Sequence, residues 1–97
     1  MVTKAIWVML KAKPGKEQEV EEFLAQGASL AESEDQTITW YGVKIMPGMY
    51  GVFDTFKDEA GRDAHLNGAI AKALMAKAPD LFDNEIKIER MDILASK

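Results

Sequence analysis

The residues of this chain best suited to chemistry lie on a short segment that ends at His65, the only histidine. An imidazole exchanges protons near neutral pH, so His65 is a candidate general base or hydrogen-bond partner for a phenolate. The alternative is a structural histidine that is bonded to the backbone or to Asp54 near the start of a helix. Both interpretations remain open from the sequence.

Asp54 is the second candidate catalytic residue. It shares strand parity with Tyr50 and Phe56. If that parity faces the helices, the carboxylate lies among apolar groups and needs a partner, because a buried unpaired charge is costly. A pair with His65 would orient the imidazole for catalysis, whereas a pair with Arg62 would be structural. Arg62 could instead neutralise an anionic substrate or lie exposed on its helix.

Aromatic side chains could supply the binding surface for a flat aromatic ligand. Trp7, Trp40 and Tyr50 are candidates because aromatic rings stack with an offset on one another. Trp40 is the one expected in the pocket. As a set, aromatic residues on strands also build cores and dimer interfaces, which is the competing explanation.

The composition describes one globular domain, residues 1–97, with 47% hydrophobic and 29% charged residues. The absence of cysteine excludes disulfides, a thiolate nucleophile, zinc fingers and iron–sulfur ligation. A single histidine leaves a transition-metal site short of ligands, so no metal site is expected. The net charge of −4 disfavours nucleic acid as a partner.

Charge and hydropathy also limit the location. Residues 17–35 carry seven acids and no base, which is typical of a solvated helix face. No apolar run approaches the roughly 20 residues that span a bilayer, so no membrane partner is expected. The apolar stretch Ala5–Leu10 is too weak for a signal peptide. We therefore expect a cytoplasmic protein.

Hydrophobic periodicity predicts the first half of the fold. A β-rich strand over Ala5–Ala12 ends at Pro14–Gly15, and a helical stripe follows from Lys16 to Ala31. Gly27 in that helix permits close packing against a sheet. Residues 36–46 alternate as a strand, and the turn pair Pro47–Gly48 leads into a strand over 49–57.

The second half is predicted to be a helix and a final strand. Asp58 is a plausible N-cap. The helix is interrupted at Asn67–Gly68, either as a simple break or as a pocket lip that exposes the Asn67 amide, and it is expected to stop before Pro79. The last strand, Ile86–Ala95, changes apolar parity, which predicts a bulge near Glu89–Arg90.

The predicted order βαββαβ is an α+β, ferredoxin-like arrangement: a four-stranded antiparallel sheet with two helices on one face. The other face of the sheet is left uncovered. In so apolar a chain the simplest solution is a homodimer in which two sheets pack face to face as a dimeric α/β barrel.

This pattern resembles the antibiotic biosynthesis monooxygenase domain of the dimeric α/β-barrel superfamily over nearly the whole chain. The resemblance rests on the element order and on four sequence features: the opening strand with Pro14–Gly15, the acidic helix, Trp40 on the second strand, and Phe53-Asp54-Thr55-Phe56 leading to Ala64-His65-Leu66. It implies a homodimer with a pocket in each subunit between the sheet and its helices.

The resemblance also implies a range of activities: cofactor-free oxygenases of electron-rich polycyclic phenols, quinol oxygenases and haem-degrading relatives. The haem degraders match poorly. The positions of their helical Trp and ligating His hold His65 and Met75 here, and the first strand lacks their Asn. We therefore expect neither haem nor flavin.

Two functions follow as hypotheses. The first is a cofactor-independent monooxygenase or oxidoreductase of a small aromatic, quinol- or anthrone-like substrate. In it His65 and Asp54 are catalytic, and Trp40, Tyr50, Arg62, Asn67 and Trp7 bind substrate. The second is a non-catalytic dimeric module that binds a small ligand or serves in assembly, because one fold supports both kinds of role.

Overall fold

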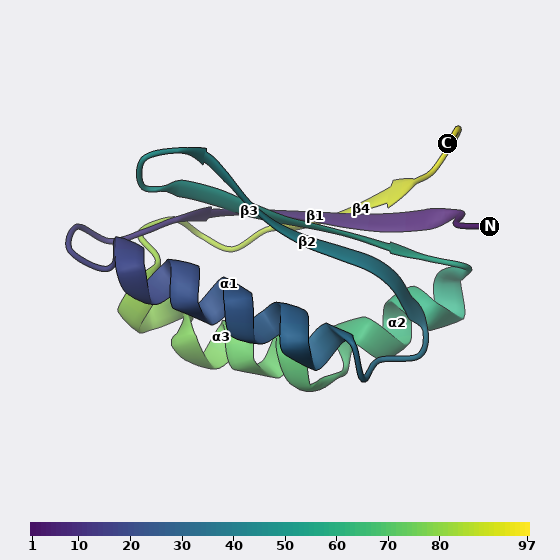
Figure 1. Ribbon diagram of the computed structural model, residues 1–97, viewed down its shortest axis with the longest axis horizontal. Helices are drawn as coiled ribbons and strands as arrows, with labels where there is room; N and C mark the ends of the chain where they lie inside the picture. Colours follow the sequence, from purple (N-terminus) through teal and green to yellow (C-terminus); the bar gives the residue numbers. More distant parts are fainter.

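The computed structural model describes all residues, 1–97, and confirms the α+β, ferredoxin-like fold. The elements in chain order are β1 (Lys4–Lys11), α1 (Glu17–Ala31), β2 (Thr37–Met46), β3 (Met49–Phe56), α2 (Glu59–Leu66), α3 (Ala69–Leu81) and β4 (Ile88–Asp92). The expected interruption at Asn67–Gly68 is confirmed and divides the second helical segment into α2 and α3. All three helices cover one face of the sheet (Figure 1).

The antiparallel sheet has the strand order β2-β3-β1-β4. Trp40 and Ile6 both lie directly opposite Asp54 on the neighbouring strands. Residues opposite one another share a face of a sheet, so these three side chains belong to the face that the helices cover. The alternation predicted for residues 36–46 therefore places Trp40 in the helix-facing layer.

The core lies between the sheet and the helices, and it contains Val20, Leu24, Tyr50 and Phe56. α1 packs so closely on β2 that a Cβ added to Gly27 would lie 2.9 Å from Cη2 of Trp40. The expectation that Gly27 permits close packing is confirmed. The position admits only hydrogen because the indole occupies the space where a methyl group would lie.

Two boundary predictions were wrong. α3 continues through Pro79 to Leu81, because a proline so near the C-terminus of a helix removes only one hydrogen bond. The carbonyl that it frees belongs to Met75, an exposed residue. β4 is shorter than predicted and pairs with β1 in unbroken register, without a bulge at Glu89–Arg90. The change in apolar parity arises because the outer face of the sheet also carries apolar residues.

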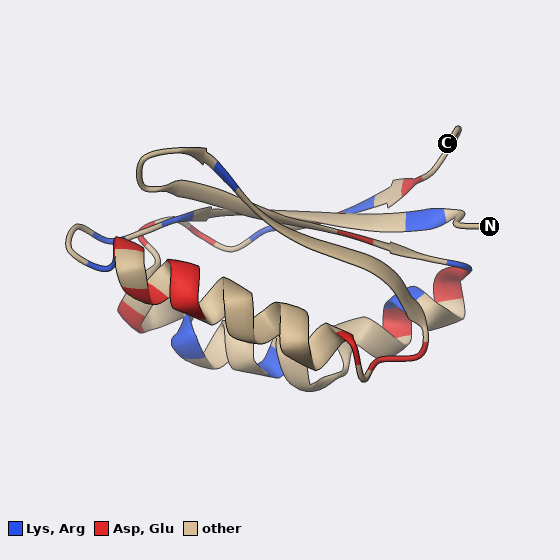
Figure 2. Cartoon of the chain, viewed as in Figure 1, with Lys and Arg blue, Asp and Glu red and all other residues tan.

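That outer face is uncovered (Figure 1), and the strands of the sheet consist mostly of uncharged residues (Figure 2). Met9, Tyr41 and Val43 lie on it with 43%, 55% and 37% of their surface exposed. The acidic residues gather instead at the start of α1 and in the loop between α1 and β2. No helix has both the length and the apolarity that a membrane crossing requires.

Candidate functional site

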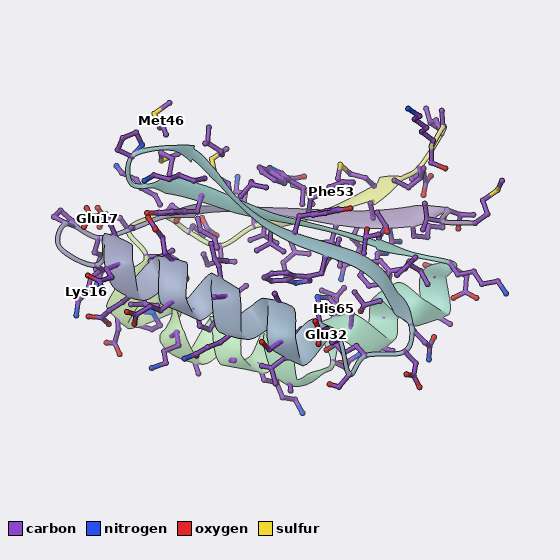
Figure 3. All side chains as sticks on the ribbon, viewed as in Figure 1. Lys16, Glu17, Glu32, Met46, Phe53 and His65 are labelled. Carbon is purple, nitrogen blue, oxygen red and sulfur yellow. The ribbon has the colours of Figure 1, made fainter.

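His65 lies in the layer between the sheet and the helices (Figure 3), and a carboxylate contacts each of its ring nitrogens. Its Nε2 is 2.8 Å from Oδ2 of Asp54, and its Nδ1 is 2.6 Å from Oε1 of Glu34. Ionised carboxylates only accept hydrogen bonds, so this arrangement favours a proton on both ring nitrogens. The three side chains form a carboxylate–imidazolium–carboxylate array.

Each member of the array comes from a different element. Asp54 points inward from β3 and is completely buried. His65, 7% exposed, lies on the last turn of α2. The Asp58 carboxylate accepts a hydrogen bond from the Gly61 amide and so caps α2, as predicted, which sets where that helix starts. The Phe56 ring packs against the imidazole with centroids 5.4 Å apart.

Glu34 comes from the loop between α1 and β2, and its position is held from two sides. The Thr37 hydroxyl donates to Oε1 at 2.8 Å, the same oxygen that faces His65. The second oxygen lies near Gly68, where an added Cβ would be only 3.2 Å away. Gly68 therefore leaves room for this carboxylate at the N-terminus of α3, where the helix dipole favours negative charge.

The environment of His65 shifts its titration. Burial lowers the pKa of the imidazole, but its contacts with Asp54 and Glu34 outweigh burial and hold the pKa above its usual value. A group whose pKa is raised on folding stabilises the native state fully below its unfolded pKa. That stabilisation is lost as the pH rises through the folded pKa.

We therefore expect the free energy of unfolding to fall as the pH is raised from about 6.5, the ordinary pKa of histidine. Urea denaturation at pH 6 and pH 9 measures the change. The control is the double variant Asp54→Asn/His65→Gln, which lacks both charges and should show a flatter profile across this window. Equal slopes for the two proteins would contradict the prediction.

A small cavity lies on the sheet side of His65. It has a volume of about 40 Å³ and is lined mainly by apolar side chains, together with Trp40, Asp54 and His65. Neither Asp54 oxygen has a hydrogen bond of good geometry, and the one short polar contact of the carboxylate is the 2.8 Å ion pair with His65. The buried indole Nε1 of Trp40 also has no partner.

Trp40 and Asp54 both line the cavity and lie directly opposite each other on β2 and β3, and they carry one unpaired donor and one under-satisfied acceptor. Such groups are costly in an apolar setting unless a ligand or water satisfies them. A hydroxyl group can accept from Trp40 Nε1–H and donate to Asp54.

A hollow of about 390 Å³ opens at the protein surface on the opposite side of His65. Its lining includes Glu34, Asp35 and the residues at the α2–α3 junction, and His65 is the one residue that lines both this hollow and the inner cavity. The imidazole thus separates the buried space from the surface.

The other residues proposed for the site are dispersed. Tyr50 donates a hydrogen bond to Glu21 at 2.6 Å, and this contact raises the pKa of Tyr50 to about 12. It does not line the inner cavity. Trp7 lies on the outer face, over Gly51 and away from His65.

Arg62 and Asn67 also lie apart from the inner cavity. The Arg62 guanidinium is buried and donates to the carbonyl oxygens of Met91 and Ala5, at 3.1 and 3.5 Å, so it ties α2 to β1 and β4 rather than pairing with Asp54. The Asn67 amide donates to the Asp63 carbonyl at the end of α2. Arg62 thus anchors α2 to the sheet, and Asn67 forms a hydrogen bond at the C-terminal end of α2.

Sequence reasoning missed Glu34. It belongs to the acidic block at residues 17–35, and nothing in its spacing separates it from Glu32 or Asp35. Only the packing of the loop against α2 identifies it. No group of three or more histidine, cysteine or acidic side chains in the structure could hold a metal ion.

Comparison with solved structures shows the family. The NE2512 protein of Nitrosomonas europaea, a protein of unknown function, is 48% identical, with a TM-score of 0.95 over all of this chain and 94% of the other. The chain belongs to the same family as that protein.

More distant structures share the fold. A putative antibiotic biosynthesis monooxygenase from Nitrosomonas europaea has a TM-score of 0.84 at 14% identity, over 95% of this chain and 90% of the other. A second antibiotic biosynthesis monooxygenase has a TM-score of 0.81 at 14% identity, over 95% and 99% of the two chains. No protein-family model matches the chain, and no curated protein does.

Proposed function

We propose that this protein is a cofactor-independent monooxygenase that oxidises a small phenolic, anthrone-like substrate between the sheet and the helices. The observation that carries the proposal is the Asp54 carboxylate, completely buried in an apolar cavity with oxygens free of well-directed hydrogen bonds and an imidazolium beside it. Two distant structures with this fold are named antibiotic biosynthesis monooxygenases, which supports the same class of reaction.

The reaction converts a methylene group between aromatic rings into a ketone: R₂CH₂ + O₂ → R₂C=O + H₂O. Asp54 removes a proton from the methylene carbon, and the resulting carbanion gives one electron to O₂. The two radicals combine as a peroxide, R₂CH–OO⁻, which takes the proton back. The remaining C–H bond then breaks as the C=O bond forms and the O–O bond cleaves, and the released hydroxide takes up that second proton as water. The substrate supplies all four electrons, so the reaction is balanced without a further reductant.

The protein contributes a base, a charge and a donor. Asp54 accepts the proton, and His65 offsets the negative charge that would otherwise be unpaired among apolar groups. Trp40 Nε1–H donates to the oxygen of the substrate, where negative charge develops. The base is therefore Asp54. His65 acts through Asp54 by supplying its counter-charge. The proposal gives no substrate-binding role to Tyr50.

Access requires a side-chain movement, because about 40 Å³ is far below the roughly 150 Å³ of a cavity that binds benzene. Leu24 and Trp40 line both this cavity and a surface groove of about 410 Å³ between α1 and β2. They form the wall between the two. Rotation of the Trp40 side chain would join the groove to the cavity.

Oxygen consumption with anthrone-like phenols and quinols tests the proposal. Asp54→Asn should reduce uptake above autoxidation by about 10²–10⁴-fold, the usual contribution of a general base. Asp63→Asn is the matched control, because Asp63 is an exposed acid on the neighbouring helix. Uptake that is absent in the wild-type protein, or equal in both variants, would contradict the proposal.

A second candidate is a non-catalytic module that binds a small ligand. The small volume of the closed cavity favours it, because the space fits a water-sized group and no ring. A phenol that binds without being oxidised would support this alternative.

We further propose that the protein forms a homodimer through the outer face of the sheet. Met9, Tyr41 and Val43 supply exposed apolar surface there, and the strands consist mostly of uncharged residues (Figure 2). A second copy of the same sheet would cover this surface.

A further inference from the structure

We propose that Glu34 is a positioning residue for the proposed reaction: when Asp54 takes the substrate proton, Glu34 takes a proton from the His65 imidazolium, and it returns that proton later in the cycle. The inference rests on the proposed function and adds a residue, a direction of proton transfer and a second opening of the site. The carrying observation is that His65 alone lines both the buried cavity and the surface hollow.

The geometry supplies a continuous path. The Asp54 carboxylate faces the cavity and lies 2.8 Å from Nε2, and the Glu34 carboxylate lies 2.6 Å from Nδ1 on the far side of the ring. Asp54 is completely buried, whereas the Glu34 side chain is 19% exposed. The two ends of the array therefore differ in their access to solvent.

The transfer involves one proton at each end of the array and no change in oxidation state. Before the reaction His65 is an imidazolium between two carboxylates. When the substrate proton neutralises Asp54, the Nδ1 proton of the imidazolium passes to Glu34, which leaves a neutral imidazole protonated on Nε2. Asp54 later delivers its proton to the peroxide, and Glu34 returns its proton to Nδ1, which restores the charged array.

The remaining charged groups near His65 do not compete for this role. Asp35 lines the hollow but makes no contact with the imidazole, and the Arg62 guanidinium on α2 is bound to carbonyl oxygens. Thr37 on β2 lies 3.5 Å from Nδ1, at the limit of a hydrogen bond, and its closer partner is Glu34 at 2.8 Å. Glu34 is the one acidic partner of His65 with access to the surface.

Glu34→Gln removes the charge and the proton acceptor but keeps the shape of the side chain. Glu32→Gln is the matched control, because Glu32 is an exposed acid just before the same loop. Two measurements are made on each: the titration of the His65 ring nitrogens by ¹⁵N nuclear magnetic resonance, and the pH profile of kcat for oxygen uptake. A single histidine makes the ring resonances unambiguous.

We expect the His65 titration to move to lower pH in Glu34→Gln and to stay in place in Glu32→Gln. We also expect kcat to fall at least about tenfold with KM unchanged, and the histidine limb of its pH profile to move with the titration. Glu34→Asp, which restores a carboxylate, should recover part of kcat.

The outcomes separate this inference from the proposed function. An unchanged His65 titration in Glu34→Gln overturns the inference, whether or not the protein consumes oxygen. A shifted titration with an unchanged pH profile of kcat also overturns it. If the wild-type protein consumes no oxygen on any substrate, the proposed function fails and the relay fails with it. A shifted titration in that case leaves Glu34 only as a structural partner of His65.

Discussion

Replacing His65 with leucine should lower the free energy of unfolding by about 3–5 kcal/mol, because the substitution leaves the Asp54 carboxylate buried without a counter-charge. Chemical denaturation at pH 6 measures the loss. In a domain of this size such a change corresponds to a fall in Tm of more than about 10 °C. This is the largest stability effect that we expect from any single substitution at the site.

The source of that loss can be identified by a second substitution. Asp54→Asn in the His65→Leu background removes the stranded charge and should restore about 2 kcal/mol, since a neutral amide is far cheaper to bury than a carboxylate. Asp63→Asn in the same background is the control, because Asp63 is exposed. If Asp54→Asn restored nothing, the cost of His65→Leu would arise from packing instead of charge.

Val43→Glu should convert the proposed homodimer into a monomer at micromolar concentration. Val43 lies on the uncovered outer face of the sheet, opposite Gly51, with 37% of its surface exposed. In a face-to-face dimer, a glutamate there would be buried without a partner in both copies. Sedimentation equilibrium measures the association constant directly.

Ser29→Glu is the control for this dimer prediction, because it adds the same charge on the exposed side of α1 in the helical layer. It should leave the association constant unchanged. A wild-type protein that sediments as a monomer would refute the dimer, as would a Val43→Glu variant that associates as tightly as the wild type.

The strand and helix order could be predicted because it depends on local periodicity. The helix-facing positions of Trp40 and Asp54 follow from the alternation of side chains along β2 and β3. The Asp58 cap follows from the residue type next to a helix start. The change in parity before Met91 was misread as a bulge. A residue pattern records which positions are apolar but does not record that both faces of this sheet are apolar.

The site could be predicted only in part. His65 and Asp54 are distinctive by type, and their pairing was one of the two alternatives that the sequence left open. Glu34 could not be found, because its contact with Nδ1 joins residues 31 positions apart through the packing of a loop against a helix. The contacts of Arg62 could not be found for a related reason: its partners are backbone carbonyls, which every residue carries.

The position of β2 at the border of the sheet has a consequence for the behaviour of the protein at high concentration. One side of this ten-residue strand has no neighbour, so its backbone groups can pair with a strand from another molecule. Register irregularities at Thr37/Thr39 and Lys44/Met46 interrupt the strand near both ends. They limit the straight length available for such pairing, and thereby protect the protein against edge-to-edge aggregation.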